Sequence, residues 1–206
     1  MIELLVGTTN QGKFAEVQAF LQKLPLKIHS LASLGSWPPI VEDGTTFEEN
    51  ALKKARVLAE YSGHITLADD SGLEVDALNG APGIYSARYA GEESDDAKNN
   101  AKLLCELRNV PEDKRSARFV CVLALCAPHS RAMKELTVHE SCEGRIAFSL
   151  KGNHGFGYDP LFFYPPWGKT FGEIDRETKA TVSHRGKALK KLAEMLSNLV
   201  ELDTKP

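Results

Sequence analysis

The chain has 206 residues, of which 42% are hydrophobic and 26% charged, as is usual for a globular protein with a sizeable core. Its formal net charge of -3 argues against a general nucleic-acid-binding surface but allows a local basic pocket. No apolar stretch is long enough to cross a bilayer, and the N-terminus lacks the basic start of a signal peptide. We therefore expect neither nucleic acid nor a membrane as a partner.

The first third of the chain alternates short apolar runs with apolar residues at helical spacing. The spacing Thr46-x-x-Glu49 is a capping box, which marks the start of a helix. The predicted elements are a strand over Glu3–Val6, a helix after Asn10, a strand near Lys27–Ser30, a helix from Thr46 to Gly63 and a strand over Ile65–Ala68.

Later segments favour one helix, a long hairpin and a closing helix. These are a helix over Asp95–Arg108, strands over Ser116–Ala127 and Met133–Glu143, and a helix from about Ser183. There is no repeat and no Ser/Gly linker. We therefore expect a mixed, twisted α/β sheet flanked by helices, in one domain of two lobes over residues 1–206.

The four cysteines are spaced neither as CxxC pairs nor as zinc-finger ligands. Two of them, Cys121 and Cys126, lie in an apolar run that begins at Phe119. Reduced core thiols, and with them a cytoplasmic location, are the expected interpretation.

Two adjacent carboxylates, Asp69 and Asp70, follow the apolar run Ile65–Ala68 and precede Ser71 and Gly72. Side chains alternate along a strand, so the two acids should point in different directions. Their proximity is costly without a proton or a cation, and Mg²⁺ prefers one or two carboxylates together with substrate phosphates. The alternative is a simple turn, since Asp-Ser-Gly is also good turn chemistry.

The segment Gly7–Lys13 reads G-x-x-x-x-G-K between a predicted strand and a predicted helix, as in a phosphate-binding P-loop. The next residue of a P-loop is Ser or Thr, whereas here it is Phe14, which argues against a P-loop NTPase. Asn10 is a plausible N-cap, which places Lys13 in the first helical turn against the helix dipole. A phosphate bound at the helix N-terminus would resolve that conflict, and a solvated surface lysine is the alternative.

Basic residues also gather at the predicted start of the last helix, where Lys179, His184, Arg185 and Lys187 surround Ser183. A polyphosphate would explain this charge at the positive end of a dipole, and Arg185 could also donate to a carbonyl. The alternative is a solvated basic helix end.

Two loops add further candidates. Glu42 lies in the Pro-containing loop before the capped helix and offers another acid for a metal, unless it is only a surface acid. The segment Gly155–Pro160 combines flexible glycines with Phe156, Tyr158 and Asp159, which suits stacking on a base and accepting from ring N–H groups. The alternative is a loop whose aromatic residues pack in the core.

Separated motifs agree, in order, with one family. They are Thr8-Thr9-Asn10-x-x-Lys13, Thr46-Phe47-x-Glu49-Asn50-Ala51, Ala68-Asp69-Asp70-Ser71-Gly72-Leu73, Gly80–Tyr89, Gly155-Phe156-Gly157-Tyr158-Asp159-Pro160 and Ser183-His184-Arg185-Gly186. The chain thereby resembles the inosine-triphosphate pyrophosphatase family of non-standard purine NTP pyrophosphatases. The resemblance implies Mg²⁺-dependent hydrolysis of ITP, dITP and XTP to the monophosphate and pyrophosphate, by a homodimer with its active site in a cleft between two lobes.

The resemblance also implies roles for individual residues. Asp70 is expected to be the general base and a metal ligand, and Glu42 a second metal ligand. Triphosphate contacts are expected from Thr8, Thr9, Asn10, Gln11, Gly12, Lys13, Ser71 and Lys179. The base pocket is expected to contain Phe156, Gly157, Tyr158, Asp159, His184 and Arg185. A nucleotide sensor without catalysis and a P-loop-type NTPase remain alternatives.

Overall fold

The computed structural model describes residues 2–91, 93–131, 133 and 135–203, with side chains described as far as Ser197. The strands are β1 (Ile2–Val6), β2 (Leu26–Ser30), β3 (Ile65–Val75), β4 (Ser116–Cys126), β5 (Leu136–Ile146), β6 (Phe162–Tyr164) and β7 (Lys169–Thr170). The α-helices are α1 (Gln11–Leu21), α2 (Phe47–Ser62), α3 (Asp96–Glu106), α4 (Arg176–Ala180) and α5 (His184–Asp203).

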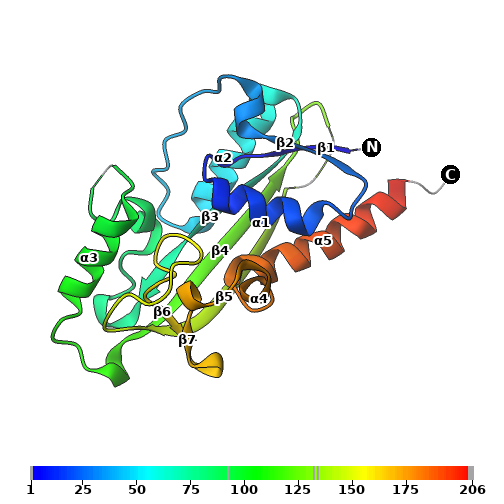
Figure 1. Cartoon of the computed structure of the whole chain (residues 1–206). Coiled ribbons are helices and arrows are strands. Elements are labelled where there is room, and N and C mark those ends of the chain that lie inside the picture. Colours follow the sequence, from blue (N-terminus) through cyan, green and yellow to red (C-terminus); the bar gives the residue numbers. More distant parts are fainter. Residues whose placement is uncertain (1, 92, 132, 134, 204–206) are drawn as a thin grey trace. The chain divides into compact units, whose positions relative to one another are not determined.

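The strands form one mixed sheet in the order β2-β1-β3-β4-β5-β6-β7 (Figure 1). β1 pairs in parallel with both β2 and β3, whereas β6 pairs antiparallel with β5 and β7. This arrangement confirms the predicted mixed α/β sheet flanked by helices.

The residues fall into two compact units. The first unit comprises Met1–Asp70, Cys121–Glu140 and Arg185–Pro206, and the second comprises Ser71–Val120 and Ser141–His184. The boundaries fall inside β3, β4 and β5, so each of these strands contributes residues to both units.

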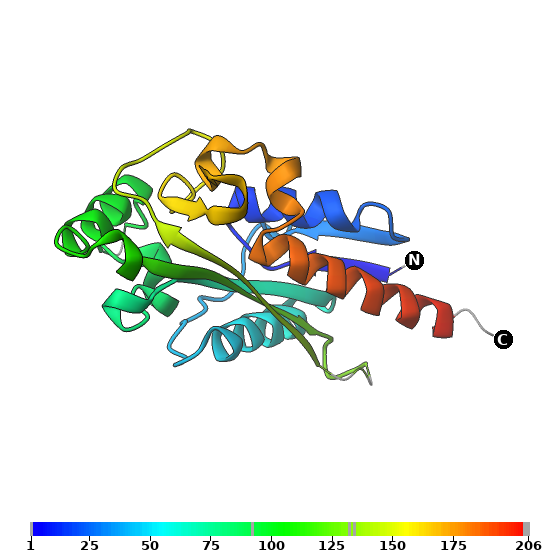
Figure 2. The same ribbon diagram turned by 90° about the horizontal axis from the view of Figure 1, so that it is seen from below.

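The first unit buries residues on both faces of its part of the sheet, with α1 and α5 on one face and α2 on the other (Figure 2). Because side chains alternate along β1, Leu4 and Val6 join the cluster that includes residues of α1 and α5, whereas Leu5 packs with Leu58 of α2. This two-sided burial explains why the parallel strands read as nearly continuous apolar runs.

The second unit has its own apolar core. Its largest fully buried side chains include Phe162 and Phe171, which pack with Leu73 of β3 and with Leu103 of α3. The rings of Phe162 and Phe171 lie 4.9 Å apart between centroids, in a tilted arrangement. This core holds the glycine- and aromatic-rich segment 155–160 through Tyr158 and Leu161.

The predicted end of β3 is wrong. The strand was expected to stop at Ala68, with the acid pair beyond its end, but it continues through Asp69 and Asp70 to Val75. Two opposing facts explain the difference. The pairing with β1 ends at Leu67, near the predicted end of the strand, but the buried side chains of Leu73 and Val75 keep the backbone extended in the second unit.

The other elements follow the sequence patterns closely. α5 begins directly after Ser183, and α3 begins after Asp95, whose carboxylate accepts from the N–H groups of Ala97 and Lys98. The second hairpin strand runs over Leu136–Ile146 and thus begins three residues later than predicted.

The four cysteines are free, and Cys121 and Cys126 are buried as expected. Among the described residues, no helix combines the length and apolar character needed to span a membrane.

Candidate active site

The Asp69 carboxylate is the centre of a buried charge network in the first unit. Its Oδ2 accepts from Nε of Arg185 at 2.8 Å, and its Oδ1 forms an ion pair with Nζ of Lys13. Arg185 also donates from Nη1 to Oε2 of Glu16 at 2.9 Å. The network joins β3, α1 and the first turn of α5.

Burial and charge act in opposite directions on Asp69. Burial disfavours the ionised form, but the charges of Arg185 and Lys13 outweigh it and hold the pKa of Asp69 well below its usual range. The thiol of Cys121 lies 3.4 Å from Oδ2 of Asp69, and burial together with that carboxylate raises the pKa of Cys121. Asp69 is therefore a permanent carboxylate, and Cys121 remains a protonated thiol beside it.

Asp70 faces a different environment on the other side of the strand, as the alternation along β3 predicted. Nζ of Lys54 on α2 lies 3.8 Å from Oδ1 of Asp70 and 3.0 Å from Oε1 of Glu42. The same ammonium donates to the backbone carbonyl of Asp69 at 3.1 Å. Lys54 thus holds two carboxylates, from β3 and from the loop before α2, in one small cluster.

Asp70 does not have enough positive charge around it to offset its burial. Burial raises the pKa of Asp70 to about 6; Lys54 and Lys13 oppose this rise, and Glu42 and Asp69 add to it. Oδ2 of Asp70 is also buried and has no hydrogen-bond partner among the described residues. Of the two adjacent acids, Asp70 is therefore the one with an available oxygen and a pKa near neutrality.

The loop that carries Glu42 is held by the start of α2. Thr46 caps the helix by accepting from the N–H of Glu49, as predicted, and the carboxylate of Glu49 accepts from the N–H of Thr45 at 2.7 Å. The buried Asn50 accepts from the N–H of Gly44 at 2.8 Å. A Cβ at Gly44 would lie 2.7 Å from that same amide oxygen, so only glycine allows this close approach.

The start of α1 confirms the predicted cap. Oδ1 of Asn10 accepts from the N–H of Lys13 at 3.0 Å, and Oγ1 of Thr8 accepts from the N–H of Asn10 at 3.2 Å. Thr9, Asn10 and Gln11 are exposed, as a phosphate-binding turn requires. Lys13, however, is paired with Asp69, so a carboxylate already supplies an anion at this helix end.

The second unit contains a separate charge pair beneath the glycine- and aromatic-rich segment. Asp159, 1% exposed, pairs with Lys179 of α4, and its Oδ2 also accepts from the N–H of Phe156 at 2.9 Å. Nζ of Lys179 lies 5.2 Å from the centroid of the Phe156 ring. A Cβ at Gly155, where φ is +77°, would overlap the Asp159 carboxylate, so this turn depends on glycine.

Two residues of α3 that sequence reasoning did not select fix the same segment. Asp96 accepts from the N–H of Gly157 at 2.7 Å, and Nδ2 of Asn100 donates to the carbonyl of Gly157 at 2.9 Å. The hydroxyl of Tyr158 donates to the carbonyl of Ser86 at 2.8 Å. Tyr158 is therefore a structural residue of the segment, and Phe156 is its half-buried aromatic ring.

The remaining predicted site residues are placed as follows. His184 is buried in the second unit and stacks on Phe119, with ring centroids 4.7 Å apart. Arg185, also predicted for the base pocket, is 2% exposed and engaged with Asp69 and Glu16. Ser71 follows Asp70 directly in β3. The substrate-binding roles of these residues stay predictions.

Lys54 and Glu16 belong to the charge clusters but were absent from the predicted site, and the sequence holds a signal for each. Lys54 occupies the apolar stripe of α2, three residues after Ala51 and four before Leu58, where a charge needs a partner. Glu16 lies three residues after Lys13 on the same face of α1. The signal was a charge within an apolar stripe in α2, and two opposite charges three residues apart in α1.

Together these features define an α/β protein whose first unit has paired acids and a capped helix N-terminus and whose second unit has a glycine- and aromatic-rich segment. The Ham1 family model matches residues 4–195, and the chain belongs to this family. The resemblance predicted from the motifs is thereby confirmed.

Named relatives agree with this assignment. A "dITP/XTP pyrophosphatase" of Desulforamulus reducens is 51% identical over 96% of this chain and 97% of its own. The solved structure of a Ham1 protein from Coxiella burnetii is similar with a TM-score of 0.87 at 41% identity, covering 96% of this chain and 100% of that one. A "nucleoside-triphosphatase / dITP/XTP pyrophosphatase" of Mycobacterium abscessus has a TM-score of 0.75 at 40% identity, covering 95% and 100%.

The Asp69 network predicts a large loss of stability in Asp69→Asn. The substitution removes the carboxylate charge that pairs with the buried Arg185 guanidinium and with Lys13, so we expect the free energy of unfolding to fall by about 3–5 kcal/mol. Urea unfolding monitored by circular dichroism would measure it. Asp43→Asn, which breaks an exposed pair with Lys53, is the control and should leave the free energy of unfolding nearly unchanged. Equal losses in the two variants would contradict the network.

Asp70→Asn should have the opposite effect. The pKa of Asp70 rises on folding from 3.8 to about 6, so folding favours its protonated form. Protonated Asp70 contributes fully to stability below the pKa that it has in the unfolded chain. This contribution is lost as the pH rises past its pKa in the folded chain. At pH 8 with chelator, Asp70→Asn should therefore unfold with a free energy about 1–3 kcal/mol higher than the native chain. The difference should vanish near pH 4, and a less stable variant at pH 8 would refute the assignment.

Proposed function

We propose that this chain is an Mg²⁺-dependent pyrophosphatase that hydrolyses ITP, dITP and XTP to the monophosphate and pyrophosphate. The observation that carries the proposal is the unequal state of the two adjacent acids. Asp69 is fixed as a carboxylate by two cations. Asp70, which shares Lys54 with Glu42, has a pKa of about 6 and an oxygen with no hydrogen-bond partner among the described residues. The names of the relatives, dITP/XTP pyrophosphatase, supply the substrate class.

The residues around Asp70 suit a hard divalent cation. Asp70 and Glu42 present carboxylate oxygens to the same ammonium, that of Lys54, and the buried Oδ2 of Asp70 is not satisfied by another described group. A protein usually contributes one or two carboxylates to a Mg²⁺ site, and water and phosphate occupy the remaining positions. Bound there, Mg²⁺ would neutralise phosphate charge and position the α-phosphorus. Asp70 and Glu42 are the residues that would hold it.

Asp70 is the proposed general base. A base with a pKa near the working pH combines an available ionised form with useful proton affinity. Asp70 would orient a water molecule or take a proton from it as the water attacks the α-phosphorus. Lys54 keeps the carboxylates of Asp70 and Glu42 on the same side of β3, so it is a positioning residue.

The start of α1 is the proposed site for the departing pyrophosphate. Exposed N–H groups at a helix N-terminus favour an anion, and Thr8, Thr9, Asn10, Gln11, Gly12 and Lys13 form that turn. Because Asp69 fixes the ammonium of Lys13, little reorganisation is needed when charge develops on the leaving group. Ser71, next to Asp70, and Lys179 complete the proposed phosphate contacts.

The segment 155–159 of the second unit is the proposed recognition element for the purine. Phe156 would stack on the base, and Asp159, fixed by Lys179, shapes the turn that presents the ring. ITP and XTP carry a carbonyl at purine position six, where ATP has an amino group, so a hydrogen-bond donor would favour the first two. Since Nε and Nη1 of Arg185 are engaged with carboxylates, His184 is the first candidate for that donor.

A product assay with Asp70→Asn tests the reaction. Purified protein with Mg²⁺ is offered ITP, XTP, dITP, ATP and GTP separately; pyrophosphate should form from the first three, with ATP and GTP nearly untouched. Asp70→Asn should lower kcat at least about 10³-fold while ITP binding, measured by calorimetry, largely survives.

Asp76→Asn, which alters a half-exposed acid that pairs with Arg118, is the matched control and should keep its activity. Orthophosphate released from ATP would favour a P-loop-type NTPase instead. Tight binding of nucleotide without turnover of any substrate would favour a nucleotide sensor.

Phe156→Ala tests the base side separately. Loss of one aromatic–base stack, about 1–3 kcal/mol, should raise KM for ITP about 5- to 150-fold with a smaller change in kcat. Phe148→Ala removes an exposed ring of the same unit and is the control, with KM expected to stay unchanged. A loss confined to kcat would assign Phe156 to the chemistry rather than to binding.

The homodimer that the resemblance implies and the cytoplasmic location expected from the reduced thiols complete the proposal. Light scattering of the purified protein measures the first, and cell fractionation the second.

A further inference from the structure

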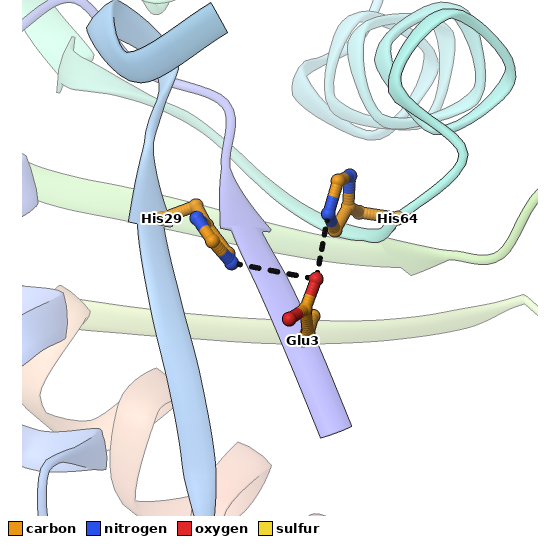
Figure 3. A group of neighbouring side chains, drawn as sticks. All are labelled: Glu3, His29 and His64. Atoms are coloured by element: carbon orange, nitrogen blue, oxygen red, sulfur yellow. Dashed lines mark hydrogen bonds and ion pairs between the residues drawn. The ribbon is translucent and has the colours of Figure 1, made fainter. Parts of the chain in front are cut away.

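Three potential metal ligands meet in the first unit, away from the proposed active site (Figure 3). Glu3 comes from β1, His29 from β2 and His64 from the turn between α2 and β3. One ligand atom of each lies within 4.8 Å of the others, and among the described residues this is the one group of three or more His, Cys, Asp and Glu side chains so placed.

The hydrogen bonds of His64 determine which of its nitrogens could bind a metal. Nδ1 lies 2.8 Å from the carbonyl oxygen of Ser62, which can only accept, so Nδ1 carries a proton. In the neutral ring Nε2 is then an acceptor, and it lies 2.9 Å from Oε2 of Glu3, another acceptor. Two acceptors at this distance require a proton or a cation between them. The bond to Ser62 is also the kind of outer contact that orients metal-binding histidines.

His29 and Glu3 also direct ligand atoms toward the position next to Nε2 of His64. Nε2 of His29 lies 3.6 Å from Oε2 of Glu3, is buried, and makes no hydrogen bond with any described residue. The second carboxylate oxygen of Glu3 is held by Nζ of Lys27 at 2.9 Å. Figure 3 shows both imidazoles directed toward the Glu3 carboxylate.

We propose that Glu3, His29 and His64 bind one divalent transition-metal ion of the Zn²⁺ type, with the fourth position open to water. Two imidazoles and a carboxylate suit Zn²⁺ and its neighbours, whereas Mg²⁺ prefers oxygen ligands alone. Ligand atoms that share a tetrahedral Zn²⁺ at its usual bond lengths lie about 3.3–3.6 Å apart. The observed 2.9 and 3.6 Å to Oε2 of Glu3 bracket that spacing, so small side-chain rotations complete the site.

This site would be separate from the proposed active site, and its expected effect is on stability. His64 precedes Asp70 by six residues along β3, which corresponds to about 20 Å of extended strand. The metal would tie β1 to β2, which ends the sheet, and to the turn before β3. Because the three segments come together only in the folded chain, bound metal stabilises the fold by mass action.

Metal titration of the full chain tests the proposal. The protein is first freed of metal with a chelator and dialysed. It is then titrated with ZnCl₂ in excess Mg²⁺, which occupies any site built from oxygen ligands alone. Calorimetry should give one Zn²⁺ per chain at micromolar affinity, and Tm should rise by about 5 °C at saturation. His29→Gln and His64→Gln should each weaken Zn²⁺ binding at least about tenfold, and Co²⁺ in the native chain should give a tetrahedral visible spectrum.

Two control variants make the result specific. His139→Gln removes an exposed histidine near Glu48, and Glu42→Gln alters the proposed Mg²⁺ site; both should bind Zn²⁺ as the native chain does. No binding at micromolar Zn²⁺, or unchanged binding in a His29→Gln/His64→Gln double variant, would overturn the proposal. If Tm rises as the pH is lowered but does not change when Zn²⁺ is added, a proton alone bridges Glu3 and His64, and the metal site is refuted.

Discussion

The buried carboxylate of Asp69 is the constraint on which the rest of the first unit depends. A charge that is 4% exposed is tolerated only with close partners, and Lys13 and Arg185 supply them from the two helices on one face of the sheet. The pairing fixes α1 and α5 against β3 at one point. It also explains why a lysine can occupy the first turn of α1, where the helix dipole disfavours it.

The same constraint makes the neighbouring acid reactive. Because Lys13 and Arg185 pair directly with Asp69, Asp70 on the other side of the strand forms its ion pair with Lys54 and shares that ammonium with Glu42. Two adjacent residues of one type thus acquire opposite ionisation properties from the alternation of a β-strand. A site that needs one inert and one titratable carboxylate gains both from a single Asp-Asp pair.

The second unit also contains a buried ion pair. Asp159 and Lys179 form a buried pair that secures a glycine-rich turn, and α3 anchors the turn through Asp96 and Asn100. Both units therefore place a buried ion pair directly under a loop with a proposed substrate role. The Glu3, His29 and His64 cluster differs, since two imidazole nitrogens face one carboxylate oxygen of Glu3 while Lys27 pairs with the other.

The sequence by itself determined the mixed α/β class, the helix caps at Asn10 and Thr46, and the family, because these rest on local periodicity, capping chemistry and ordered motifs. It also predicted that Asp69 and Asp70 diverge. It could not determine that β3 continues past them, since burial of Leu73 and Val75 belongs to tertiary packing. Nor could it assign Arg185 to Asp69, 116 residues away, or bring His29 and His64 to Glu3. Those contacts depend on which strands become neighbours in the sheet, and local sequence patterns do not determine the order of the strands.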